Sequence, residues 1–285
     1  MKILKNWLEL ERSIFSHWRM ILNISKKDFI KEFAGTRLGL FWAVVRPLAQ
    51  IIVFWVVFGM VFSSGPLDLM VHGKKQAVPY LVWLVAGYIP WMFISEYIVS
   101  GASSIRQNAF LVKKVKFPVE ILPSIRLGVS FYNYLILVVI NFVIMAANGW
   151  LGKINYLMVI YATIVTLVFL TALARLFATW VVMSPDFIHG IGVAMNFLFW
   201  LCPVMWGFHQ LTGMTLVPQH YIHLIMTLIK VNPLTYLVLA YRDAYLGTSY
   251  IGWHYTVYFF IVTILLFMFS SKVFKKFRPE FDDVL

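Results

Sequence analysis

Long apolar runs separated by short polar stretches make up most of the chain. A helix needs about 20 mostly apolar residues to cross the hydrocarbon core of a bilayer. Six runs have about this length, at residues 38–62, 78–105, 121–147, 156–183, 188–208 and 251–271. The pattern therefore predicts an all-α integral membrane protein with six transmembrane helices, in a transmembrane domain that covers residues 37–285.

A further apolar region before residue 251 is divided by Pro203, Pro218 and Pro233 into pieces too short to span. Backbone that is not helical survives at membrane depth only where protein or a water-filled space satisfies its polar groups. We therefore expect short re-entrant extracellular helices, or interfacial ones, before the last span.

Residues 1–36 form a region of their own, in which apolar residues recur at helical spacing with charged residues between them. A face of this kind, with cations opposite, is typical of a helix that lies in the membrane interface. We expect a cytoplasmic amphipathic helix here, and packing on another subunit is an alternative compatible with it. The expected apolar face comprises Leu4, Trp7, Leu8, Ile14, Phe15, Trp18, Ile21 and Leu22.

Basic residues are concentrated in three segments, at residues 2–37, 106–116 and 272–278. If six helices alternate in direction, all three segments fall on the same side of the membrane. Cytoplasmic loops of membrane proteins carry an excess of lysine and arginine. The sequence therefore predicts that both termini are cytoplasmic.

The composition excludes a soluble fold. Hydrophobic residues make up 61% and charged residues 13% of the chain, against roughly one half and one quarter in a soluble domain. The net charge of +12 is accounted for by the cytoplasmic segments, so we expect membrane lipids and no nucleic acid as partners.

No catalytic constellation is visible. The phosphate-binding pattern G-x-x-x-x-G-K-[ST] and the patterns H-E-x-x-H and G-x-S-x-G do not occur. Cys202 is the single cysteine, and the seven histidines are scattered. The sequence therefore predicts no catalytic, cofactor-binding or metal site in this chain.

Charged residues within the apolar runs are candidates for function, since a charge in hydrocarbon is costly. Glu96 lies deep in the second run, where pairing with an arginine and facing a hydrated conduit both stay open. Arg46, Arg126 and Arg175 lie nearer the cytoplasmic ends. For these three, anchoring to the headgroups is favoured over contact with a substrate.

Several motifs in series resemble one protein family. In chain order they are RLGLFWAVVRPLAQIIVFWVVFG (37–59), VPYLVWLVAGYIPWMFISEYIVSGASSI (78–105), NAFLVKKVKFPVEILP (108–123), CPVMW (202–206), NPLTYLVLAYRDAYLG (232–247) and the C-terminal KFRPEFDDVL. Their order and spacing are similar to those of the ABC-2 type permeases that export lipid-linked polysaccharides. The IPW…FIS stretch and the C-terminal tail most resemble the members that export teichoic acid.

The resemblance implies a permease subunit, not an enzyme, in an ATP-driven exporter of the bacterial cell membrane. It implies a homodimer that works with two copies of a separate ABC ATPase, which binds ATP and Mg. The implied cargo is wall teichoic acid linked to an undecaprenyl-type lipid, and export of O antigen or capsular polysaccharide is the alternative. An integral membrane enzyme acting on lipid-linked sugars would need grouped acidic or histidine residues, which are not evident.

The resemblance also implies where the functional regions lie. The loop after the second span is expected to form a coupling helix on the ATPase, and an ordinary positive loop is the alternative; the residues concerned are Phe110, Leu111, Lys113, Lys114, Phe117 and Pro118. Aromatic side chains can support a sliding sugar polymer, and the candidates for lining the conduit are Trp42, Trp55, Trp91, Phe93, Phe199 and Trp200. Candidate polar or phosphate contacts are Glu96, Arg46 and Arg242, although a local ion pair or an interface anchor is an alternative for Arg242.

Overall fold

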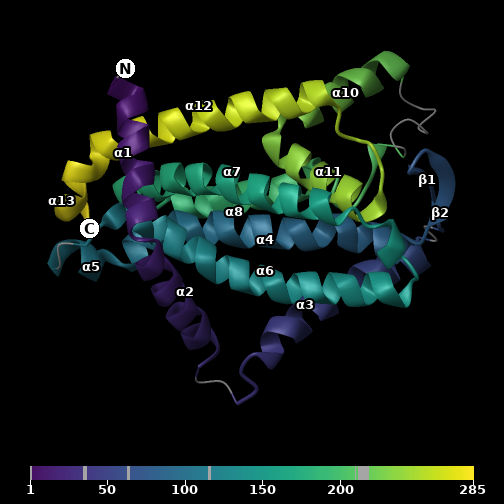
Figure 1. Cartoon of the computed structure of the whole chain (residues 1–285), viewed down its shortest axis with the longest axis horizontal. Helices are drawn as coiled ribbons and strands as arrows, with labels where there is room; N and C mark the ends of the chain where they lie inside the picture. Colours follow the sequence, from purple (N-terminus) through teal and green to yellow (C-terminus); the bar gives the residue numbers. More distant parts are fainter. Residues whose placement is uncertain (1, 35–36, 63–64, 115–116, 209, 211–217) are drawn as a thin grey trace.

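The computed structural model describes residues 2–34, 37–62, 65–114, 117–208, 210 and 218–285. Figure 1 shows long helices running side by side, with both chain ends at the same end of the bundle. Among the described residues, five helical segments are long and apolar enough to cross a membrane: α3 (Phe41–Phe54) with the π-helix η1 (Trp55–Val61), α4 (Tyr80–Gln107), the 3-10 turn η2 (Val119–Ile121) with α6 (Leu122–Ala147), α7 (Tyr156–Met183), and α12 (Trp253–Phe277) with the 3-10 turn η4 (Arg278–Glu280). The predicted all-α membrane fold is confirmed.

The fifth predicted span, 188–208, is shorter than expected. Its helix α8 (Phe187–Leu201) ends at Leu201, and Cys202 leaves the helix with φ −69° and ψ 145°. The proline that follows Cys202 causes this, because a proline disfavours the helical conformation of the residue before it. With 15 residues, α8 is roughly 22 Å long. It packs against α4 and α7.

Two short helices before the last span form a sharply bent pair, at the place where short re-entrant helices were predicted. Helices α10 (Gln219–Val231) and α11 (Pro233–Leu246) meet at an angle of 93°. Near this bend Leu234 lines a small cavity together with Phe169, which is halfway along α7. Every residue from Leu234 to Leu246 is buried, so α11 is a core element in spite of its length.

Helix α4 forms the centre of the bundle, and α3 lies at its margin. In the most apolar part of α4, 78% of the residues are buried, against 6% in the segment formed by α3 and η1. Helix α4 packs against α6, α7 and α11. The exposed apolar surface of α3 and η1 is therefore left for lipid or for a second protein.

A β-hairpin that the sequence analysis did not predict connects η1 to α4. Its strands β1 (Leu67–Val71) and β2 (Lys74–Val78) are antiparallel. His72 and Gly73 form the turn, with φ values of 48° and 76°. Two consecutive residues with positive φ are the requirement of a type I′ turn, which suits the twist of a hairpin.

The hairpin is fixed to two neighbouring loops. The amide of His72 donates a hydrogen bond to the carbonyl of Gly247, which follows α11, at 2.8 Å. The ring Nε2 of His72 is 2.9 Å from the carbonyl of Lys153, in the 3-10 turn η3 (Leu151–Lys153) between α6 and α7. Lys153 in turn donates to Gln76 of β2 at 2.7 Å. These bonds join the hairpin, η3 and the loop after α11 at the end of the bundle opposite to the termini (Figure 1).

Two helices at the N-terminus cross the end of the bundle instead of running along it (Figure 1). Helix α1 (Lys2–Ser16) packs on α12, and α2 (Trp18–Phe33) packs on α6. The predicted single amphipathic helix is thus two helices, and part of its apolar face is used within the chain. Several of its apolar side chains stay exposed, among them Leu8, Phe15, Trp18 and Leu22.

The end of the bundle that holds both termini also holds the loop after α4. This loop contains α5 (Ala109–Lys114), which contacts the C-terminal helix α13 (Phe281–Val284). A small apolar cluster joins α1, η2, α7 and α12 there; it comprises Leu10, Ile105, Val119, Ile121, Leu122, Ile125, Ala178, Val182, Phe274 and Phe281. The N-terminal helix, the loop and the C-terminal tail therefore pack as one unit.

Candidate functional site

Two adjoining cavities lie along one face of α4. Tyr88, Met92 and Glu96 line both of them, and their spacing of four residues places them on one stripe of the helix. The α3 cavity, of about 380 Å³, lies between α2, α3, α4 and α6. The α8 cavity, of about 440 Å³, lies between α3, α4 and α8. Together they follow α4 along the bundle.

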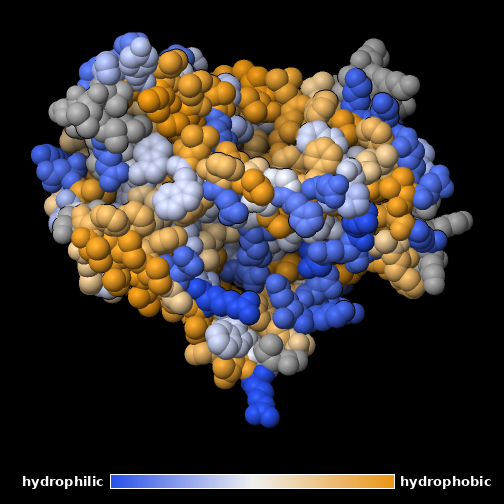
Figure 2. Space-filling model, turned by 180° about the vertical axis from the view of Figure 1, so that it is seen from behind, coloured by the Kyte–Doolittle hydropathy of each residue, from blue (hydrophilic) through white to orange (hydrophobic). Residues whose placement is uncertain are grey.

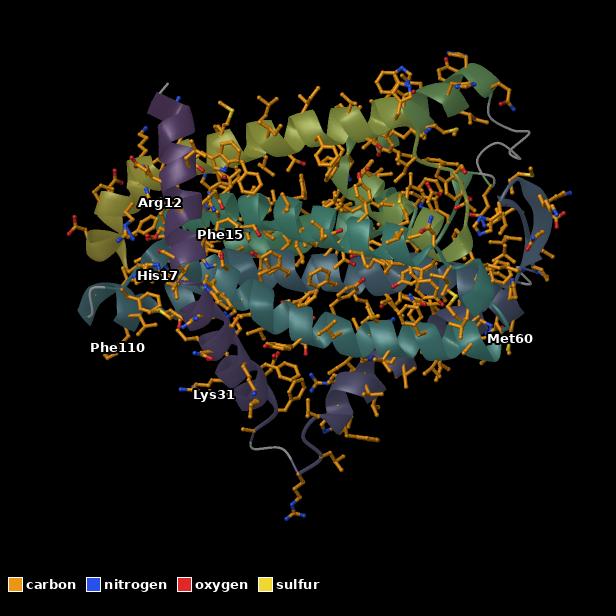
Figure 3. The ribbon with its side chains drawn as sticks, in the orientation of Figure 1. Arg12, Phe15, His17, Lys31, Met60 and Phe110 are labelled. Atoms are coloured by element: carbon orange, nitrogen blue, oxygen red, sulfur yellow. The ribbon has the colours of Figure 1, made fainter. Side chains whose placement is uncertain are left out.

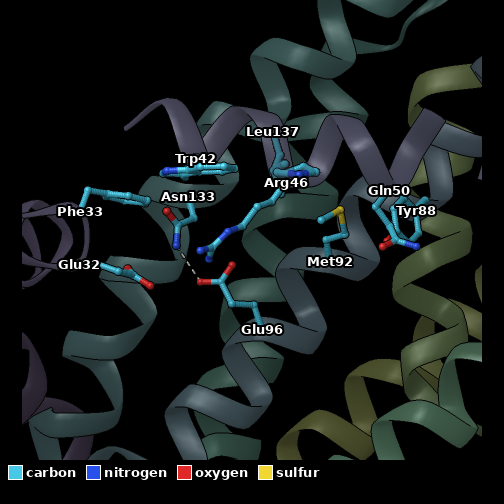
Figure 4. A pocket seen from close by; sticks show the side chains of 12 residues that line it. Glu32, Phe33, Trp42, Arg46, Gln50, Tyr88, Met92, Glu96, Asn133 and Leu137 are labelled. Carbon is cyan, nitrogen blue, oxygen red and sulfur yellow. Dashed lines mark hydrogen bonds between the residues drawn. The ribbon is translucent and has the colours of Figure 1, made fainter. Parts of the chain in front are cut away.

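Charged and polar groups line the α3 cavity. Figure 4 shows Arg46 of α3 and Glu96 of α4 pointing toward one another. The side-chain amide of Asn133 donates to Glu96 Oε1 at 2.9 Å, and Glu32 adds a second carboxylate. The Arg46 guanidinium lies 5.9 Å from the centroid of the Trp42 ring. The cavity thus offers a cation, two carboxylates and an aromatic face to a ligand rich in hydroxyl groups.

Aromatic rings dominate the α8 cavity. Phe199 of α8 lies within 5.8 Å of Phe54 and within 6.1 Å of Tyr88 and of Trp91, measured between ring centroids. Flat apolar faces of this kind bind other flat apolar faces without fixing a single position. A cavity of this composition suits a chain of sugar rings that moves past it.

Polar side chains are not spread evenly over the molecule. Figure 2 shows the face opposite to that of Figure 1, and hydrophilic side chains gather around a hollow near its centre. Large apolar areas lie to the sides of this hollow. A hydrophilic hollow between apolar areas is unusual for a surface that contacts only lipid.

The six aromatic residues predicted for the conduit fall into two groups. Those that line one of the two cavities are Trp42, Trp91 and Phe199. Phe93 does not, because it is fully buried and stacks on Tyr134 with 4.6 Å between ring centroids. Trp55 packs at the edge of the main core, and Trp200 is 57% exposed on α8.

Arg242 is buried in the core and does not face either cavity. Its guanidinium lies 3.8 Å from the centroid of the Trp83 ring and donates to the carbonyls of Val204 at 2.7 Å and Trp206 at 3.4 Å. Gly87 makes this possible, since a Cβ there would lie only 2.8 Å from Nε of Arg242. The predicted phosphate contact does not fit this position. Arg242 instead ties the loop after α8 to α4 and α11.

The neighbouring Asp243 fixes the loop after α11. Its carboxylate accepts hydrogen bonds from the hydroxyl of Thr248 at 2.7 Å and from the amides of Tyr250 and Ile251, both at 2.8 Å. Among the described ion pairs none joins Arg242 to Asp243. Arg242 thus fixes the loop after α8, and Asp243 fixes the loop after α11.

The predicted coupling residues lie at the end of the bundle that holds both termini. Phe110 projects from the end of the molecule in Figure 3 and is 62% exposed, and Lys113 is exposed beside it. Leu111 and Phe117 pack on the apolar cluster of this end. The carbonyl of Pro118 accepts the hydrogen bond that begins η2; the side chain of Lys114 lies outside the described residues.

Sequence comparison decides the family of this helical bundle. The family of ABC-2 type transporters matches residues 20–246, which is most of the chain. The chain belongs to this family. It is therefore the membrane part of a transporter and not an enzyme.

Individual relatives of this ABC-2 type transporter are distant but match almost end to end. An O-antigen export system permease protein RfbA of Klebsiella pneumoniae is 20% identical over 267 residues, which are 93% of this chain and 95% of the relative. A protein of the same name from Myxococcus xanthus is 20% identical over 275 residues, which are 96% of this chain and 98% of the relative. The two relatives are therefore aligned with this chain over nearly the whole of both sequences.

One important ion pair of the ABC-2 chain was missed in the sequence. Arg175 of α7 is 1% exposed, and its Nη2 lies 2.6 Å from Oε1 of Glu11 in α1. Its Nη1 donates to Ser271 of α12 at 3.1 Å. The predicted headgroup anchor is therefore wrong for Arg175. Arg126, by contrast, is at the surface, where it donates to Gln107 at 3.0 Å.

Glu120 was also missed, and it joins three segments at the end with both termini. It accepts a hydrogen bond from Ser13 of α1 at 2.8 Å and lies 3.5 Å from Arg278 at the end of α12. Glu120 itself is the second residue of η2, the turn after the coupling loop. An acidic residue within the basic stretch KKVKFPVE was the signal in the sequence, since a lone carboxylate among cations often has a specific partner.

Proposed function

We propose that this chain is the permease subunit of an ATP-driven exporter that moves a lipid-linked polysaccharide across the cell membrane. The observation that carries the proposal is the pair of cavities along α4, one polar and one aromatic. A polysaccharide presents hydroxyl groups and apolar ring faces in alternation, and the two linings match these two kinds of surface.

The working unit in this proposal is a homodimer with two copies of a separate ABC ATPase that binds ATP and Mg. The support for a dimer is the low burial of α3 and η1, 6% against 78% in α4. A second copy on that side would cover the apolar surface and close the cavities into a conduit. Both termini and the coupling loop are cytoplasmic in this arrangement, so Phe110 and Lys113 face the ATPase.

O antigen is the polymer class that we favour. The relatives that match the chain over more than nine tenths of its length are named for O-antigen export. Wall teichoic acid is the second candidate, supported only by the likeness of the IPW…FIS stretch and the C-terminal tail. Both polymers are taken here to be carried on an undecaprenyl-type lipid.

The test is complementation in two bacterial hosts, one without its O-antigen exporter and one without its teichoic acid exporter. The chain is expressed in each host with the ATPase of its own cell, and the polymer at the cell surface is quantified. We expect surface polymer in the O-antigen host. Polymer only in the teichoic acid host would assign the second candidate, and no polymer in either host, with both subunits assembled in the membrane, would refute export of both polymers.

A pair of variants on α8 connects the result to the cavities. Phe199→Ala removes a ring that lines the α8 cavity, and we expect surface polymer to fall several-fold because the stacking of one ring contributes about 1 kcal/mol. Phe197→Ala removes a ring that is 73% exposed on the same helix, and we expect little change. Equal effects of the two substitutions would contradict the assignment of the conduit.

A further inference from the structure

An apolar groove lies under the N-terminal helices, among elements that do not line the α8 cavity. It has a volume of about 420 Å³ and is formed by α1, α2, α6, α7 and α12. In Figure 3 this is the side of α1 on which Phe15 is labelled. Its lining includes Ile14, Phe15 and Trp18 from the N-terminal helices and Leu167 and Val168 from α7.

The interior of the groove is suited to hydrocarbon. Two polar side chains at its lining already have partners within the chain: Glu11 pairs with Arg175 at 2.6 Å, and the hydroxyl of Thr171 donates to the carbonyl of Leu167 at 2.8 Å. A sugar or a peptide in the groove would lose hydrogen bonds to water and find few new ones. A hydrocarbon chain would lose none.

The groove opens onto surface that faces lipid. Along α7, Ile160, Ile164 and Val168 are 57%, 54% and 43% exposed, and this strip lies within a predicted membrane span. On α6, Leu135 and Val139 follow the groove residue Phe131 at intervals of four residues and are also exposed. A lipid chain can therefore enter the groove from the bilayer without crossing a polar region.

Arg19 places a positive charge at the rim of the apolar groove. The guanidinium of Arg19 lies 5.6 Å from the centroid of the Trp18 ring, and Trp18 lines the groove. Among the described ion pairs, Glu9 and Glu11 of α1 are engaged by Lys275 and Arg175, and Arg19 is in none. A cation beside an apolar groove complements a molecule with an anionic head and a hydrocarbon tail.

We propose that this groove holds one acyl chain of an anionic phospholipid from the adjacent leaflet, with the phosphate near Arg19. The volume has room for much of one acyl chain and for only a fraction of a polyprenyl chain, which is several times longer. The aromatic lining proposed for the polymer lies elsewhere, around α8. The groove is thus a lipid site separate from the proposed export path, and it requires only that the chain lies in a membrane.

The site is tested by native mass spectrometry of the full-length protein released from phosphatidylglycerol and phosphatidylcholine mixtures. Val168→Trp places an indole in the groove, and we expect bound phosphatidylglycerol to fall about tenfold or more, because several methylene groups lose their contacts. Val139→Trp adds the same side chain on α6 at a position 62% exposed and outside the groove, and we expect no change.

The headgroup contact has its own pair of variants. Arg19→Gln is expected to reduce the preference for phosphatidylglycerol over phosphatidylcholine about five-fold, the effect of one cation near an anionic lipid surface. Lys27→Gln removes the same charge from an exposed position on α2 and should leave the preference unchanged. Equal lipid binding by Val168→Trp and the wild type overturns the proposal. Complete displacement of phosphatidylglycerol by decaprenyl phosphate also overturns it and assigns the groove to a polyprenyl chain.

Discussion

Replacing Gly87 by alanine would put a methyl group against the guanidinium of Arg242. The new Cβ would lie 2.8 Å from both Nε and Nη2 and 3.1 Å from Cζ. The guanidinium is held between the Trp83 ring and the carbonyl of Val204, so it cannot retreat without losing one of these contacts.

The size of the effect follows from the contacts that are lost. A desolvated cation–π contact contributes about 2 kcal/mol, and a hydrogen bond to a charged group about 1.5–3 kcal/mol. In the opposite direction, alanine in place of glycine stabilises the helix by up to about 1 kcal/mol, because alanine has the higher helix propensity. Loss of one of these contacts, less the gain in helix propensity, is expected to lower the free energy of unfolding of Gly87→Ala by about 1–2 kcal/mol, which corresponds to a fall in Tm of roughly 2–8 °C.

The chain carries its own probe for this measurement. Cys202 is the single cysteine and is fully buried. It is the first residue of the loop after α8, in which the carbonyl of Val204 accepts a hydrogen bond from Arg242. Its labelling by a thiol-reactive dye during heating in detergent reports unfolding at this place. Gly190→Ala on α8 is the matched control, since a Cβ there meets nothing within 4 Å. A Gly87→Ala protein as stable as Gly190→Ala would refute the reasoning.

Three further substitutions test other contacts. Glu11→Ala leaves the guanidinium of Arg175 buried without its carboxylate, and we expect a loss of about 3 kcal/mol in a thermal unfolding experiment. Gly247→Ala requires a positive φ of 70° in a residue with a side chain and pushes against the His72 ring, so faster amide exchange is expected in the β-hairpin, for a cost of about 1–3 kcal/mol. Glu120→Ala removes the acceptor that fixes α1, and amide exchange in α1 should rise for a cost of about 1–2 kcal/mol.

Each of these three substitutions has a control in which the same residue type is replaced by alanine at another position. Glu9→Ala breaks an ion pair whose acid is 53% exposed, so a loss below about 1 kcal/mol is expected. Gly252→Ala meets nothing within 4 Å, and Glu280 is exposed, so neither Gly252→Ala nor Glu280→Ala should change amide exchange. If a control matched its partner variant, the specific contact would not be the cause.

Helix positions were the most predictable part of the fold, because length and hydrophobicity alone define a span. The run 156–183 coincides with α7, and 121–147 differs from α6 by one residue. The error at α8 had a visible cause, since Cys202 precedes a proline. The hairpin was missed because its second strand, KKQAV, is too polar to stand out; only the His72-Gly73 turn was a signal.

The contacts of charged residues were much less predictable. Arg175 looked like a headgroup anchor, because nothing in the local sequence reveals that Glu11, 164 positions away, reaches it. Arg242 looked accessible for the same reason, since its partners Val204 and Trp206 are almost 40 positions distant. Residue type and depth in a span indicate that a charge has a partner, but only the packing of the helices selects the partner.

The buried re-entrant helix α11 also has a consequence for the order in which the chain matures during synthesis. The chain emerges from its N-terminus, so Trp83, Gly87 and Val204 already exist when Arg242 is made. The three donors to Asp243 follow within eight residues. Both charges of α11 can thus be neutralised or solvated by protein groups almost as soon as they appear. Glu11 must wait for a partner made 164 residues later, and Glu9 for a partner made 266 residues later, so the contacts of α1 can be completed only after most of the membrane domain has been made.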